Sequence, residues 1–203
     1  MNLFINQITG SIPQILIFSL IPFIWWLVTA RKDCNFFKWI GLKKPSDGKE
    51  NKLIVWIIAT IAAFLALSVF MLYSVRDIEK ATDDFAGKGA SAIPAILIYA
   101  FFRTALSEEI LFRGFLLKRI SNKFGFTIGN ITQSALFGIL HGIMFSQQIK
   151  GILPIVIVLF TGGIGWLLGY INEKKAAGSI VPGWCVHAAA NIFSSICTAF
   201  SII

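Results

Sequence analysis

The run AIPAILIYAFFRTALSEEILFRGFLL, residues 92–117, is apolar for most of its length, yet it carries Glu108, Glu109 and Arg113 near its end. An apolar run of about 18 or more residues is typical of a helix that crosses a lipid bilayer. A charged side chain at the middle of such a helix costs about 2.5–3.5 kcal/mol even on a lenient insertion scale, so such groups usually face the bundle interior or a water-filled cavity. The run therefore predicts a membrane-spanning helix with a functional polar face.

The composition extends this interpretation to the whole chain, which is 56% hydrophobic and only 14% charged. These proportions exclude an ordinary soluble domain, and no polar connector is long enough to bury a core of its own. The sequence predicts an all-α integral membrane protein, a single domain over residues 1–203 with two N-terminal spans and a core at residues 92–203. Six apolar runs are candidate spans: Ser11–Thr29, Leu53–Val75, Ala92–Leu117, Thr127–Phe145, Gly151–Tyr170 and Ile180–Ile203.

The net charge of +8 comes mostly from three loops, residues 30–52, 118–126 and 171–179, which together hold twelve of the basic residues. The other connections hold four. Because short cytoplasmic loops are enriched in Lys and Arg, the three basic loops are predicted to face the cytoplasm of a multi-pass protein in the cell membrane. Basic loops facing anionic lipid account for the charge, so no nucleic-acid partner is expected.

Two pairs of glycines recur at a spacing that matters for helix packing. Gly138 and Gly142 form one G-x-x-x-G pair, and Gly165 and Gly169 form the other. Small residues at this spacing let neighbouring membrane helices approach closely. We expect these glycines to lie at tight helix–helix contacts.

The ionisable groups inside the apolar runs are few and specific. Eight of the ten acidic residues lie in loops, and the other two are Glu108 and Glu109. Both histidines of the chain, His141 and His187, lie inside apolar runs. Since intramembrane ionisable groups usually mark function, their placement on three separate helices predicts one polar centre.

Helical spacing assigns different roles to the two glutamates. Glu109 and Arg113 are four residues apart, so they can pair on one face of the helix. Glu108 is turned about 100° away and shares its face with aromatic residues. We expect Glu109–Arg113 to be an architectural ion pair and Glu108 to be free to act. Arg103 lies five residues before Glu108, off its face on an α-helix, and is expected either to pair across helices or to line water.

Three further polar residues in the apolar runs, together with Glu108, provide the groups needed for hydrolysis. Phe137 and His141 are four residues apart on one predicted helix, and His187 and Asn191 are four apart on another. A free carboxylate helped by one imidazole can activate water. The second imidazole and the amide can donate hydrogen bonds to an oxyanion. This combination is suited to cleaving a peptide bond.

These residues resemble the three signature motifs of the CPBP intramembrane proteases, a group that includes the type II CAAX prenyl endopeptidases and the Abi proteins of bacteriocin processing and self-immunity. The motifs are Glu108-Glu109-x-x-x-Arg113, Phe137-x-x-x-His141 and His187-x-x-x-Asn191. The resemblance implies that Glu108 and His141 activate water, that His187 and Asn191 form the oxyanion hole, and that Glu109 and Arg113 support them. It covers the C-terminal half of the chain.

The cofactor remains open on sequence grounds between none and a divalent metal such as zinc. Glu108, His141 and His187 would be its ligands, because two histidines and a glutamate form known catalytic zinc sites. The chain lacks the H-E-x-x-H pattern, however, and the three residues come from three helices. A metal-free, glutamate-dependent mechanism is the slightly favoured alternative.

Two other functions use similar residues. A proton-coupled transporter also places Glu and His inside the membrane, although it predicts inverted repeats that are not visible in this sequence. A non-catalytic bacteriocin self-immunity protein could keep the motifs as architecture. For the protease, we expect the centre to open toward the cytoplasmic half and to accept a flexible peptide or protein segment held at the lipid bilayer.

Overall fold

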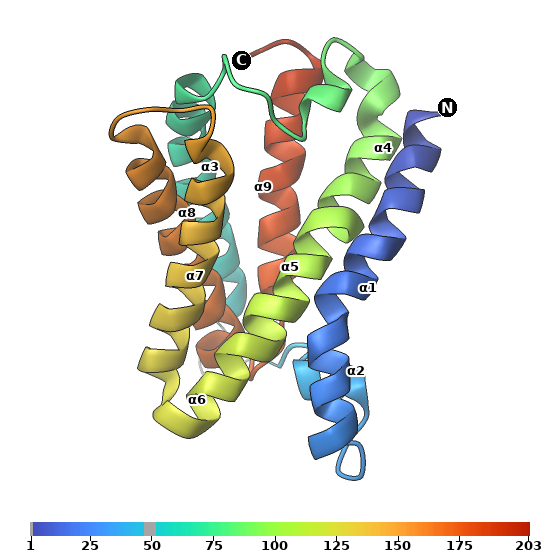
Figure 1. Cartoon of the computed structure of the whole chain (residues 1–203), viewed down its shortest axis with the longest axis vertical. Coiled ribbons are helices and arrows are strands. Elements are labelled where there is room, and N and C mark those ends of the chain that lie inside the picture. Colours follow the sequence, from blue (N-terminus) through green and yellow to red (C-terminus); the bar gives the residue numbers. More distant parts are fainter. Residues whose placement is uncertain (1, 47–51) are drawn as a thin grey trace.

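The computed structural model describes residues 2–46 and 52–203, and over these residues it is a bundle of helices without strands (Figure 1). Residues 47–51 of the predicted cytoplasmic loop 30–52 lie outside the described residues. The principal helices are α1 Leu3–Thr29, α2 Phe36–Ile40, α3 Leu53–Ser74, α4 Ile93–Ile98, α5 Ser107–Glu109, α6 Lys118–Phe124, α7 Phe126–Ser146, α8 Leu153–Tyr170 and α9 Val181–Ala199. Short 3₁₀ turns cover Asp83–Phe85 and Gly89–Ala92, and π-helical segments cover Tyr99–Leu106, Ile110–Leu117 and Ile171–Lys175.

The helices confirm the predicted membrane bundle and refine its spans. In the described part of the chain, five helical stretches are long and apolar enough to cross a membrane: Leu3–Thr29, Leu53–Ser74, Gly89–Phe124, Phe126–Ser146 and Leu153–Lys175. The sixth predicted span corresponds to α9, which is 19 residues long but less apolar than the other five. It is less apolar because it carries His187, Asn191 and several hydroxyl groups, which face other helices.

α1 begins eight residues before the predicted span because the polar residues at its start have partners within the protein. The side chain of Asn2 caps the helix by accepting a hydrogen bond from the backbone N–H of Phe4. Gln7 and Ser11, one turn apart, are buried, while large apolar side chains of the same helix are exposed. This arrangement reverses that of a soluble helix, as expected where the outer face contacts lipid tails.

The third span is one continuous helical stretch, Gly89–Phe124, which begins with the 3₁₀ turn Gly89–Ala92 and continues through α4, α5, α6 and two π-helical segments. A π-helix joins residues i and i+5 by backbone hydrogen bonds, and it occurs frequently at functional sites. The looser winding changes which side chains share a face. Residues five apart lie about one turn apart in such a segment, whereas on an α-helix they point in different directions.

Tight glycine contacts between α7 and α8 confirm the expectation from the G-x-x-x-G pairs. A Cβ atom added at Gly138 would lie 2.4 Å from the carbonyl oxygen of Val158, and one at Gly169 would lie 2.0 Å from Oδ1 of Asn130. Buried amides cross the same contact: Asn130 donates to the carbonyl of Trp166 at 3.0 Å, and Gln133 donates to that of Gly165 at 2.9 Å. The two helices are therefore held at a fixed, close distance.

One end of the bundle is closed by the segment that follows α1. α2 buries Trp39 and Ile40 against Phe115 and Ile180, near the α6 end of the third span (Figure 1). At the same end, Lys118 forms an ion pair with Glu173 and donates to the carbonyl of Gly178. Both chain termini lie at the opposite end of the bundle.

Candidate active site

Glu109 and Arg113 form the ion pair that their spacing predicted. Arg113 Nη1 lies 2.9 Å from Glu109 Oε1, and both side chains are fully buried. The guanidinium also lies over the Phe137 ring, 4.3 Å from its centroid. A Cβ atom at Gly165 would lie only 3.1 Å from Arg113 Nη2, so this glycine of α8 leaves room for the arginine. The pair is thus enclosed by three helices.

Asn172 connects this ion pair to the start of α9, a role that the sequence did not indicate. Its side-chain nitrogen donates to Glu109 Oε2 at 3.4 Å, and its side-chain oxygen accepts from the backbone N–H of Gly183 at 2.9 Å. The residue is fully buried. Its position just after an apolar run, inside a predicted loop, gave no signal, because an asparagine in a loop is usually solvated.

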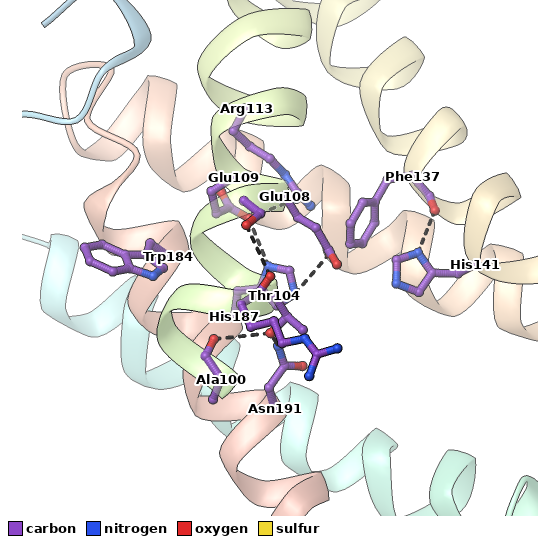
Figure 2. A network of polar contacts seen from close by, with 12 residues as sticks. Ala100, Thr104, Glu108, Glu109, Arg113, Phe137, His141, Trp184, His187 and Asn191 are labelled. Atoms are coloured by element: carbon purple, nitrogen blue, oxygen red, sulfur yellow. Dashed lines mark hydrogen bonds and ion pairs between the residues drawn. The ribbon is translucent and has the colours of Figure 1, made fainter. Parts of the chain in front are cut away.

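His187 lies between the two glutamates (Figure 2). Its Nδ1 is 3.2 Å from Glu109 Oε1, and its Nε2 is 3.5 Å from Glu108 Oε2. Glu108 and His187 keep 17% and 11% of their side-chain surface exposed, whereas Glu109 keeps none. The two neighbouring carboxylates therefore contact opposite nitrogens of one imidazole, one from a buried side and one from an open side.

His141 is oriented by its own helix. Its Nδ1 lies 2.9 Å from the carbonyl oxygen of Phe137, which fixes Nδ1 as the donor and leaves Nε2 as an acceptor. Its ring centroid is 4.4 Å from that of Phe137. Phe137 also contacts His187, at 6.0 Å between ring centroids. The Phe137 ring thus contacts Arg113 and both histidines.

Asn191 is held by Thr104, a second residue that the sequence analysis missed. The Asn191 side-chain nitrogen donates to Thr104 Oγ1 at 2.7 Å. Thr104 Oγ1 in turn lies 3.1 Å from the carbonyl oxygen of Tyr99, five residues earlier, and 3.3 Å from that of Ala100. One N–H of the amide is therefore engaged, and the other is available to a ligand. The spacing of Thr104, four residues before Glu108, was the available signal.

The four residues predicted to be catalytic line one cavity. Glu108, His141, His187 and Asn191 come from three helices, and all four face a space whose empty volume is about 1990 Å³ including open solvent. A smaller, mainly apolar cavity between α3, α7, α8 and α9 adjoins it and shares His141, His187 and Asn191. In the described residues no direct hydrogen bond or ion pair joins Glu108 to His141, although both face the larger cavity.

The larger cavity opens at the end of the bundle that carries the termini. Its outer lining comes from residues 79–84, between α3 and α4, and from Gln148 after α7. The described parts of the three basic loops lie at the other end, which α2 and the Lys118–Glu173 pair close. Two sequence-based predictions therefore exclude each other: that the basic loops are cytoplasmic, and that the centre opens to the cytoplasmic half. Loop charge reports orientation and contains no information on which end of a bundle is open.

Arg103 has the partner across helices that the sequence left open. Its Nη1 donates to Oε1 of Gln7 on α1 at 2.8 Å. The sequence placed Arg103 off the face of Glu108 and left open whether it pairs across helices or lines water. It does both, since Arg103 also lines the larger cavity that Glu108 faces. The segment that holds Arg103, Tyr99–Leu106, is π-helical.

The proposed zinc ligands do not form a metal site in this arrangement. Across residues 2–46 and 52–203, no group of three or more His, Cys, Asp and Glu side chains is placed to hold a metal ion. Glu108 and His187 lie close together, but His141 is turned toward the carbonyl of Phe137. The residues present therefore do not fit a zinc ion held by Glu108, His141 and His187.

Comparison with known proteins supports the resemblance noted in the sequence. A family model described as "Type II CAAX prenyl endopeptidase Rce1-like" matches residues 90–193. The match covers about half of the chain and includes all three motifs. Comparison with curated proteins gives no match, and neither does comparison with solved structures.

Proposed function

Since the chain belongs to the Rce1-like family of type II CAAX prenyl endopeptidases, we propose that it hydrolyses a peptide bond in a membrane-associated peptide or protein. The observation that carries the proposal is the meeting of Glu108, His141, His187 and Asn191 at one cavity. Each residue supplies a different function needed for hydrolysis. The apolar cavity beside them suits an apolar side chain or lipid group of the substrate.

In the proposed first step, water held between Glu108 and His141 attacks the carbonyl carbon of the scissile bond. Glu108 accepts a proton from the water as the new C–O bond forms. His141 supports this step because its Nδ1 is engaged with a carbonyl, so that its Nε2 can accept a hydrogen bond from the water. The product of this step is a tetrahedral intermediate with a negative oxygen.

The second imidazole and the amide are placed to stabilise that oxygen. To act as an oxyanion donor, His187 must be in its imidazolium form, with Nδ1 donating to Glu109 and with Nε2, which lies 3.5 Å from Glu108 Oε2 at the edge of the cavity, donating to the substrate oxygen. The free N–H of Asn191 supplies a second donor.

The reaction is completed by returning the proton. As the C–N bond breaks, Glu108 transfers the proton taken from water to the leaving amine, which restores the carboxylate. The products are one peptide with a new carboxyl end and one with a new amino end. Glu109 takes no part in proton transfer in this scheme, because both of its oxygens are engaged with Arg113, His187 and Asn172.

The proposal is tested by following cleavage of a defined probe by the purified protein in detergent. The probe is a short peptide that ends in a prenylated cysteine and three further residues, and mass spectrometry detects its products. We expect Glu108→Gln to reduce kcat by about 10²- to 10⁴-fold, the usual contribution of a general base. Glu79→Gln is the matched control, since Glu79 lines the mouth of the same cavity away from the histidines. Parent-like activity in Glu108→Gln would reject the assignment.

A further inference from the structure

Asn191 has a side-chain amide whose two ends have nearly the same shape but opposite chemistry. The nitrogen donates two hydrogen bonds, whereas the oxygen only accepts. To stabilise an oxyanion, Asn191 must offer an N–H of the nitrogen, because the oxygen would repel a negative charge. A half-turn of the amide exchanges the two ends, so a neighbouring group has to fix its orientation.

Thr104 supplies the contact that fixes the amide (Figure 2). Its Oγ1 lies 2.7 Å from Nδ2 of Asn191, and it faces the carbonyl oxygens of Tyr99 and Ala100 at 3.1 and 3.3 Å. A hydroxyl group has a single proton. With that proton directed to a carbonyl of its own helix, as is common for threonine, Oγ1 can only accept from the amide. It therefore binds the nitrogen end of the amide and excludes the oxygen end.

Other contacts fix the position of α9, which carries this amide. Nε1 of Trp184 donates to the carbonyl oxygen of Phe101 on the third span at 2.7 Å. The backbone N–H of Gly183 donates to the side-chain oxygen of Asn172 at 2.9 Å. Because these bonds hold the helix independently, loss of the Thr104 hydroxyl should release the amide without moving α9.

We infer that Thr104 is a positioning residue for the proposed hydrolysis, because it holds the Asn191 amide in the orientation that an oxyanion donor needs. This inference rests on the proposed function and adds to it a residue outside the three motifs. Thr104 and Asn191 line the same cavity as Glu108, and the second N–H of the amide remains for the substrate oxygen. Thr104 donates nothing to the substrate in this scheme, so its effect on the rate should pass through Asn191.

Thr104→Val tests the inference, because valine keeps the branched shape of threonine and removes its hydroxyl. Cleavage of the prenylated probe peptide is measured in detergent and expressed per folded molecule. We expect kcat to fall by about 10- to 100-fold while KM stays within about threefold, as for partial loss of a donor that acts in the transition state. Thr104→Ser keeps the hydroxyl and should stay within about threefold of the parent in kcat.

A double-mutant cycle separates positioning from a role in helix packing. In the Asn191→Ala protein there is no amide to orient, so adding Thr104→Val should change kcat by less than about threefold. Slow variants are followed with the protein in excess over the probe. Thr9→Val is the matched control, because Thr9 is exposed on α1 and its Oγ1 donates to the carbonyl of Ile5 at 3.0 Å. This control should leave kcat unchanged.

Parent-like kcat in Thr104→Val would overturn the inference and leave the proposed function standing. An equal fall in the parent and in the Asn191→Ala protein would overturn it in favour of helix packing. A Thr104→Ser protein as slow as Thr104→Val would assign the effect to the methyl group and overturn it as well. No cleavage of the probe by the parent would overturn the proposed function and this inference with it.

Discussion

Glu108 and Glu109 are adjacent in the chain, yet they belong to two regions with opposite properties. The closed region around Glu109 is fully buried, and its groups contact Arg113, Asn172 and His187. The open region around Glu108 lines a cavity, and its Oε2 makes no hydrogen bond within the protein. The Phe137 ring lies against groups of both regions, namely the Arg113 guanidinium and the two histidines.

The difference shows how one helix separates structural support from chemistry. Charges in the closed region have protein partners, so they stabilise one arrangement and resist change. Groups in the open region border a cavity, where a substrate can reach them and add hydrogen bonds. His187 is the link, because it contacts a carboxylate of each region. Substitutions in the closed region should therefore lower stability first, and those in the open region should lower the rate first.

Among substitutions that test the difference between the two regions, Arg113→Ala is expected to have the largest effect, a loss of stability. Removing one member of a buried ion pair leaves an uncompensated charge and costs about 3–5 kcal/mol. Thermal unfolding in detergent, followed by circular dichroism, should show a large fall in Tm. Arg119→Ala is the matched control on the same span: Arg119 is partly exposed and lies 4.0 Å over the Trp39 ring, an interaction of about 0.5–1 kcal/mol.

One outcome for Arg113→Ala would contradict the division into a closed and an open region. An Arg113→Ala protein with the Tm of the parent and only a reduced cleavage rate would place this arginine with the open region. The architectural assignment of the ion pair would then be wrong.

The next effect concerns the open region, through Asn191→Ala. Loss of one oxyanion donor should reduce kcat by about 10²- to 10³-fold, with little change in Tm. Asn130→Ala makes the same substitution at a fully buried amide between α7 and α8, where it should lower Tm and spare kcat per folded molecule. Rates are normalised to folded protein measured by size-exclusion chromatography. Equal losses of rate in both variants would contradict the division into regions.

The smallest effect is expected from Asn172→Ala in the closed region. It leaves the backbone N–H of Gly183 and Oε2 of Glu109 without their amide partner, at a cost of about 1–3 kcal/mol. Since Asn172 does not line the cavity, kcat per folded molecule on the probe peptide should be unchanged. A reduced kcat with stability intact would show that the closed region tunes the chemistry directly.

Much of this molecule follows from local rules that a sequence displays. Apolar runs of sufficient length gave the helical membrane bundle, because backbone groups in lipid must satisfy one another within a helix. The spacing of four between Glu109 and Arg113 gave the ion pair, and the glycine pairs gave the close contact of α7 with α8. These features depend on neighbours within about one helical turn or on the solvent around the helix.

Other features depend on how the helices pack, and they could not be predicted from local sequence patterns. The partner of Arg103 is Gln7, 96 residues away on another helix. The roles of Thr104 and Asn172 likewise require α9 beside the third span. No local pattern distinguishes a polar residue that will meet a partner from one that will be solvated.

The sequence by itself determined the chemical inventory: two carboxylates, two imidazoles, an amide and two arginines placed in apolar helices of a known motif family. Only the tertiary structure decided that Asn172 and Thr104 hold the ion pair and Asn191, that Gln7 is the partner of Arg103, and at which end the cavity opens. The physical reason is that burial and access belong to the packed surfaces of several helices together, whereas residue type and spacing belong to one helix alone.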